Sequence, residues 1–125
     1  MLGKIILWVS TLAFVSYGVM CLLDPTLPAE FAGLAILSGD GRAELGAMYG
    51  GLQTAYGVFC LLGALRADLY RPALTSLVLM MGGLAAARLY TAMMFDGGLG
   101  GYTYGAMAFE FATAILSFIA LKKSA

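Results

Sequence analysis

The stretch from Glu44 to Leu65 constrains the fold more than any other, because it is apolar enough and long enough to cross a bilayer. If successive residues turn by about 100°, small residues recur along one side of this stretch, with the amide of Gln53 among them. The glycines of this stripe are Gly46, Gly50 and Gly57. A helix face made of small residues lets a second helix approach closely. The stretch therefore predicts a transmembrane helix that packs tightly against a neighbour.

The composition of the chain predicts that it lies in lipid. Of its 125 residues, 62% are hydrophobic and only 11% are charged, which would leave a water-soluble domain of this size with too much exposed apolar surface. Seven basic residues balance seven acidic ones, and no run of lysine or arginine forms a footprint for phosphates. We therefore expect the lipid bilayer as a partner and no nucleic acid.

The residues that usually carry metal or catalytic chemistry are scarce. Histidine is absent and the acidic residues do not cluster in the sequence, so zinc and iron lack their usual ligands. Cys21 and Cys60 are expected on opposite sides of the membrane, where they cannot form a disulfide. The chain has neither a phosphate-binding loop nor a Gly-x-Ser-x-Gly motif. We therefore expect no metal, no cofactor and a protein that is not an enzyme.

Four apolar runs predict an all-α protein, an integral membrane four-helix antiparallel bundle that forms one domain. The expected helices are residues 4–23, 44–65, 72–91 and 103–121, within a domain over residues 1–125. Each has about the 20 residues that a hydrocarbon core requires. The connection 24–43 contains Pro28, which fits the first turn of a short helix, and Pro72 is expected to open the third span. Residues 96–101 are expected to form a glycine-rich loop.

The distribution of basic residues predicts the orientation. An N-in, C-in topology places Lys4, Arg66, Arg71, Lys122 and Lys123 on one side. Only Arg42 and Arg88 lie toward the other side. Because positive charge concentrates in cytoplasmic loops, both termini are expected in the cytoplasm, and residues 24–43 and 92–102 outside.

This topology brings polar groups from separate helices to the outer half of the membrane. The candidate site residues are Tyr17, Glu44, Tyr49, Gln53, Arg88 and Glu110. One interpretation is a buried ion pair of Arg88 with Glu110 or Glu44, which would fix helix register. Another is an outward-opening pocket in which Arg88 meets a small anionic ligand or a lipid headgroup. A third is a site shared across the glycine stripe, in a homo-oligomer or with a membrane-protein partner.

These interpretations leave three classes of function open. The favoured class is a non-enzymatic binding or accessory protein with an outward-facing polar site. The first alternative is a small proton-coupled transporter that uses the carboxyl group of Glu110. The second is a lipid-modifying enzyme, for which the sequence offers no evident reactive group.

A family resemblance covers nearly the whole chain. It rests on the segment from Glu44 to Gln53 with its Tyr-Gly-Gly core, on Gly57, on the stretch from Gly83 to Arg88, and on Glu110. Together these resemble a family of small four-helix bacterial membrane proteins known as domain of unknown function 4345. The resemblance implies a multi-pass protein of the bacterial inner membrane, and it implies no activity.

Overall fold

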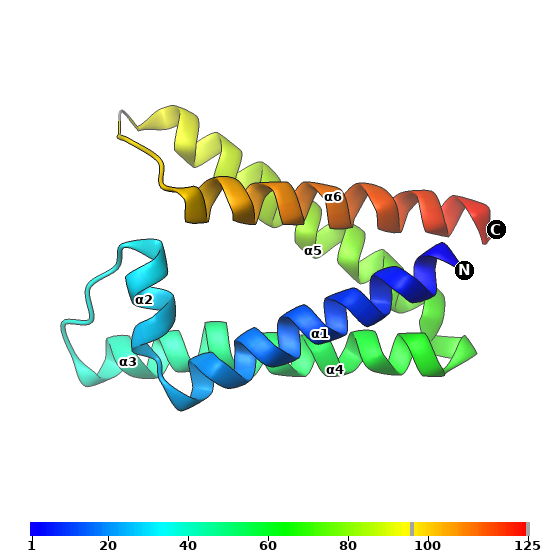
Figure 1. Ribbon diagram of the computed structural model, residues 1–125, viewed down its shortest axis with the longest axis horizontal. Coiled ribbons are helices and arrows are strands. Elements are labelled where there is room, and N and C mark those ends of the chain that lie inside the picture. Colours follow the sequence, from blue (N-terminus) through cyan, green and yellow to red (C-terminus); the bar gives the residue numbers. More distant parts are fainter. Residues whose placement is uncertain (96, 125) are drawn as a thin grey trace. The chain divides into compact units, whose positions relative to one another are not determined.

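The computed structural model describes residues 1–95 and 97–124, and within them every regular element is a helix (Figure 1). The elements are α1 (Leu2–Leu23), α2 (Thr26–Ala32), α3 (Gly39–Leu45), η1 (Gly46–Gly51), α4 (Leu52–Leu65), α5 (Ala67–Met94) and α6 (Gly101–Lys123). In this part of the chain, four helices are long and apolar enough to cross a membrane: α1, the continuous run Gly39–Leu65, α5 and α6. This confirms the all-α fold and the four candidate spans. Asp96, where the expected glycine-rich loop begins, lies outside the described residues.

The third span begins at Ala67, so the expectation that Pro72 opens it is wrong. Arg66 alone makes the turn, with an extended backbone (φ −113°, ψ 126°), and Pro72 lies inside α5. Proline there removes one hydrogen bond of the second helical turn. The carboxylate of Asp68 lies in the first turn, where the helix dipole favours negative charge. We attribute the earlier start to this placement of Asp68.

The second and fourth spans also begin earlier than the sequence predicts. The second begins at Gly39 instead of Glu44, because the side chain of Ser38 caps it by accepting a hydrogen bond from the backbone N–H of Gly41 (3.1 Å). The fourth begins at Gly101 instead of residue 103. The short helix α2 ends at Gly33, whose φ of 69° is the only positive φ in the described part of the chain.

Residues Trp8–Leu62 form one compact unit, in which α1 packs antiparallel against η1 and α4. Glycines make this close approach possible. A Cβ atom added at Gly57 would lie 2.7 Å from Val15 Cγ2 and 2.9 Å from the Val15 backbone nitrogen. Gly50 lies in the same way against Leu22, and Gly18 of α1 lies against Thr54. The glycine face of the second span thus contacts α1.

The other unit consists of Met1–Leu7 and residues 63–124, and its main feature is the antiparallel pair α5 and α6 (Figure 1). At one end of the pair, Arg71 Nη1 donates to the Ser124 carbonyl oxygen (3.0 Å) and so covers the end of α6. The buried positions are Ala73, Leu74, Leu77, Met81 and Ala85 on α5, and Glu110, Thr113, Ala114, Ser117 and Ala120 on α6. Their spacing of three and four residues is that of a helix packed along one face.

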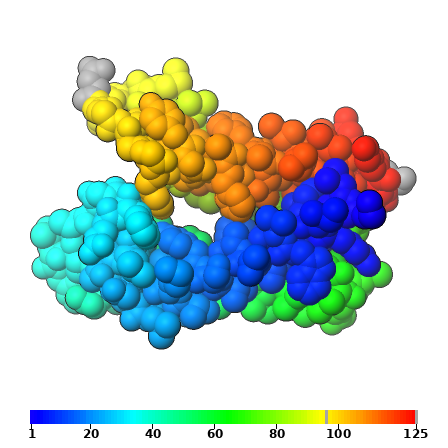
Figure 2. Space-filling model, viewed as in Figure 1, coloured from blue at the N-terminus to red at the C-terminus, as the bar shows by residue number. Residues whose placement is uncertain are grey.

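The side of α6 away from these buried positions is apolar. Ile115, Leu116 and Phe118 are exposed there, and α6, orange to red, presents a continuous surface of side chains in the space-filling view (Figure 2). Exposing such side chains to water costs free energy, whereas contact with lipid acyl chains does not.

Candidate functional site

The candidate site is built on an ion pair between α5 and α6. Arg88 Nε donates to Glu110 Oε2 (3.1 Å), and Arg88 Nη2 donates to Glu110 Oε1 (2.7 Å). Two parallel hydrogen bonds of this kind are the strongest geometry that arginine and a carboxylate adopt. At 1.5 Å per residue, Arg88 lies about 9 Å from the end of α5 and Glu110 about 14 Å from the start of α6. The pair therefore lies within the helices and not in the loop between them.

The two members of the pair are buried to different extents. The side chain of Glu110 is 6% exposed, whereas that of Arg88 is 28% exposed. The carboxylate is thus enclosed between the helices, while the guanidinium extends to their surface. A buried carboxylate without a partner would carry a large desolvation penalty, so Arg88 both compensates that charge and ties α5 to α6.

Hydroxyl groups continue the polar face of α6 beyond Glu110. Thr113 and Ser117 follow it at spacings of three and seven residues, and both are buried. The Ser117 hydroxyl is buried without a hydrogen-bond partner among the described residues. The spacing of Glu110, Thr113 and Ser117 matches the helical period, so all three lie on one face of α6.

The structure places the other candidate residues in the unit formed by Trp8–Leu62. Glu44 is exposed on α3, and Tyr49, Gln53 and Tyr17 are half-buried on η1, α4 and α1. Of the two carboxylates considered as partners of Arg88, Glu110 is the one with which the structure shows an ion pair. The structure therefore joins Arg88 to Glu110 and selects between the two carboxylates.

The predicted packing glycines do not all have the same role. Gly50 and Gly57 are buried against α1, but a Cβ atom at Gly46 would meet only Pro25, at an ordinary 3.7 Å. The reason is η1, a π-helical turn. Hydrogen bonds from residue i to i+5 add a residue to the turn, so a constant step of 100° overstates how well Gly46 aligns with Gly50. Gly18 was not predicted as a packing residue, because its only signal in the sequence is that it is a glycine within an apolar helix.

Asp24 is a second polar group with a defined role, at the start of the connection after α1. Its Oδ1 accepts hydrogen bonds from the Thr26 hydroxyl (2.6 Å) and from the Thr26 backbone N–H (3.0 Å). These two hydrogen bonds lower the pKa of the Asp24 carboxyl below its usual value. Asp24 therefore stabilises the first turn of α2 and belongs to no cluster of metal ligands. The described residues contain no group of three or more His, Cys, Asp or Glu side chains that could hold a metal ion.

The fold and the ion pair together define a class of small all-helical proteins with four candidate membrane spans and a charged pair between two of them. Within that class, the chain belongs to the family described as domain of unknown function (DUF4345), which matches residues 2–121. This confirms the family that the sequence motifs indicated. No curated protein and no solved structure matches the chain.

Proposed function

We propose that the protein is a multi-pass protein of the bacterial inner membrane that binds an anionic group, from a lipid or a small molecule, at Arg88. Both termini lie in the cytoplasm, so the site opens toward the outer side, and the protein acts by binding and not by catalysis. A single observation carries the proposal: Glu110 is enclosed while its partner Arg88 reaches the surface.

This asymmetry gives the two residues different roles. Glu110 accepts hydrogen bonds from Nε and Nη2 of Arg88 and so fixes the plane of the guanidinium group. A guanidinium has five N–H donors in one plane, a geometry that matches phosphate and carboxylate oxygens. An anion would approach Arg88 from its exposed part. Glu110 is then a positioning residue, and Arg88 contacts the ligand.

The position of the pair along the helices favours a lipid headgroup as the source of the anion. A long side chain placed about 9 Å from a helix end can extend toward the interface, where headgroups lie. The apolar side chains exposed on α6, such as Ile115 and Phe118, suit acyl chains. A lipid at this site would therefore satisfy the charged and apolar surfaces together.

The bidentate contact makes proton-coupled transport by Glu110 the less favoured alternative. Protonation of Glu110 would remove the negative charge that strengthens both of its hydrogen bonds to Arg88, so the ion pair opposes proton uptake. A lipid-modifying enzyme would need a nucleophile and a base near the ligand, and the sequence contains no histidine for the second role.

Lipid retention tests the proposal directly. Wild-type protein in nanodiscs of equal anionic phosphatidylglycerol and zwitterionic phosphatidylethanolamine would be analysed by native mass spectrometry for bound lipid. We expect the double variant Arg88→Met with Glu110→Gln to fold and to carry fewer bound anionic lipids than the wild type. Binding of the lipid held at Arg88 should be weakened by about tenfold or more, since charge-assisted hydrogen bonds contribute about 1.5–3 kcal/mol each. The control is Arg42→Met, at an exposed arginine of α3, which should retain the anionic lipid as the wild type does.

A double variant that retains anionic lipid like the wild type would refute the binding site. Proton flux in proteoliposomes provides the second measurement. Flux that is present in the wild type and lost in Glu110→Gln would support the transporter instead.

A further inference from the structure

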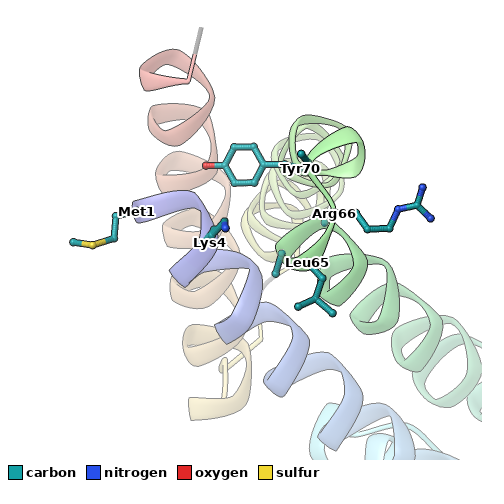
Figure 3. Close-up of a pocket in the computed structure, with 8 residues that line it drawn as sticks. Met1, Lys4, Leu65, Arg66 and Tyr70 are labelled. Carbon is teal, nitrogen blue, oxygen red and sulfur yellow. The ribbon is translucent and has the colours of Figure 1, made fainter.

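A cavity of about 400 Å³ lies where the first turns of α1 meet the turn between α4 and α5 (Figure 3). Its polar side chains are those of Lys4, Arg66 and Tyr70, and its apolar lining includes Met1 and Leu65. All of these residues belong to the unit that contains α5 and α6. Arg66 and Arg88 are 22 residues apart, so the cavity lies about 30 Å along α5 from the ion pair and forms a separate site.

Two glycines and one extended residue shape this cavity. A Cβ atom added at Gly3 would collide with the Tyr70 hydroxyl, and one added at Gly63 would collide with Ala73 Cβ. These glycines therefore let α5 lie directly against α1 and α4. The chain then reverses at Arg66 alone, because its extended backbone joins two helices without a longer loop. The lining is thus built by helix packing.

The charge that faces the cavity is positive. Arg66 is already paired with Asp68 (2.8 Å), with both side chains mostly exposed, and Figure 3 shows Arg66 extending away from the other labelled residues. Lys4 lies on the side of α1 that faces Leu65 and Tyr70 (Figure 3). It has no ion-pair partner among the described residues. Lys4 is therefore the cation whose charge the surrounding residues do not neutralise.

We propose that this cavity binds a phosphate group, held by Lys4 and the hydroxyl of Tyr70. The ammonium of Lys4 supplies charge and up to three donors, and Tyr70 supplies one more. A volume of about 400 Å³ falls in the range of about 300–1,000 Å³ typical of small-ligand sites, so the cavity holds more than a phosphate alone. The phosphate is either that of an anionic phospholipid headgroup or a free phosphate, and basic pockets at helix ends in membranes take the former.

Thermal stability in detergent separates the two sources. Wild-type protein would be titrated with short-chain dihexanoyl phosphatidylglycerol, with its phosphatidylcholine analogue, and with inorganic phosphate. We expect phosphatidylglycerol to raise the melting temperature more than phosphatidylcholine does. Lys4→Gln should weaken its apparent affinity by about fivefold, as expected for one basic residue at a headgroup. Tyr70→Phe, which keeps the ring, should weaken it less.

The matched control is Lys123→Gln, because Lys123 is an exposed lysine in the last turn of α6 and does not line the cavity. It should leave the affinity within about twofold of the wild type, as expected for a screened surface charge. If inorganic phosphate alone stabilises the protein in a Lys4-dependent way, the ligand is free phosphate. Equal effects of both lipids with none of phosphate, or equal losses in Lys4→Gln and Lys123→Gln, would overturn the proposal. The variant with Arg88→Met and Glu110→Gln should keep the Lys4-dependent shift, so this site and the outer one are tested independently.

Discussion

The ion pair of Arg88 and Glu110 adds little net stability while it is intact, but removing one partner is strongly destabilising. An intact buried pair gains Coulomb energy but loses hydration, and the two nearly cancel. Removing one partner leaves a charge with its full desolvation penalty. The Glu110 side chain is only 6% exposed, so in Arg88→Met its carboxylate would be buried without its ion-pair partner.

A double-mutant cycle on this pair should therefore show strong coupling. We expect Arg88→Met to cost about 3 kcal/mol or more of unfolding free energy, because breaking a buried pair strands its partner. Adding Glu110→Gln should restore most of that loss. Denaturation in a mild detergent, followed by circular dichroism, measures each variant. A double variant no more stable than Arg88→Met would show that the pair is not the coupled unit.

The glycines of the second span differ in the atoms that surround them, and a substitution series can resolve this difference. Gly57→Ala places a methyl group against the Val15 backbone nitrogen, which cannot move without shifting α1. We expect a cost of about 1–3 kcal/mol, as for other overpacked cores. Gly83→Ala on α5 is the control, since nothing lies within 4 Å of the added Cβ, and it should be neutral or mildly stabilising. Similar melting temperatures for the two variants would contradict the close packing of α1 on α4.

At the scale of elements, the connection between the first two spans owes its short helix to local hydrogen bonds. Asp24 fixes the start of α2 through Thr26, and Gly33 ends it with a left-handed backbone conformation. Ser38 is the N-cap of α3 and accepts a hydrogen bond from the backbone N–H of Gly41. These contacts need no tertiary partner, so α2 can be tested by itself.

The start of α2 should depend on the ionisation of Asp24. Hydrogen bonds from Thr26 lower its pKa, so the stabilisation is complete above the usual value of 3.8 and is lost as the pH falls through the lowered value. We expect hydrogen exchange to show protection of α2 amides that is constant from neutral pH down to mild acid and falls below that range. Asp24→Ala should remove it at neutral pH, whereas Glu30→Ala, at an exposed residue of the same helix, should not. Unchanged protection in Asp24→Ala would rule out this role of Asp24.

At the scale of the whole molecule, the charge bias predicts a single orientation in the membrane. Five basic residues at one set of helix ends outweigh the two toward the other. Lys122 and Lys123 end α6 on the basic side, where they also complement the helix dipole. Membrane orientation and the helix dipole therefore both favour positive charge at the C-terminal end of α6.

Reporter fusions test this orientation. Green fluorescent protein joined after the C-terminus should fluoresce, and alkaline phosphatase at the same place should be inactive, because both would lie in the cytoplasm. The same reporters inserted after Gly98, in the connection between α5 and α6, should give the opposite result. An active C-terminal phosphatase would invert the topology and place the Arg88 site on the cytoplasmic side.

The sequence by itself determined the all-α class, the four candidate spans and the family, because apolar length and helical period are local properties of the chain. It also identified Glu110 as a candidate partner of Arg88. The predicted helix starts were less accurate. Glu44 and Pro72 were the predicted first residues of the second and third spans. Ser38 and Asp68 instead favour earlier starts through local contacts within one turn. The predicted connection 66–71 was therefore too long, because Arg66 alone joins α4 to α5.

Only the tertiary structure decided which groups meet. Arg88 had two carboxylates at a similar predicted depth, and side-chain geometry between α5 and α6 selected Glu110. The π-helical turn η1 moved Gly46 away from the alignment that a uniform helix gives it. The cavity beside Lys4 arises from two glycines, Gly3 and Gly63, that are far apart in the chain. Such features depend on distances between segments, which a periodic pattern within one segment does not encode.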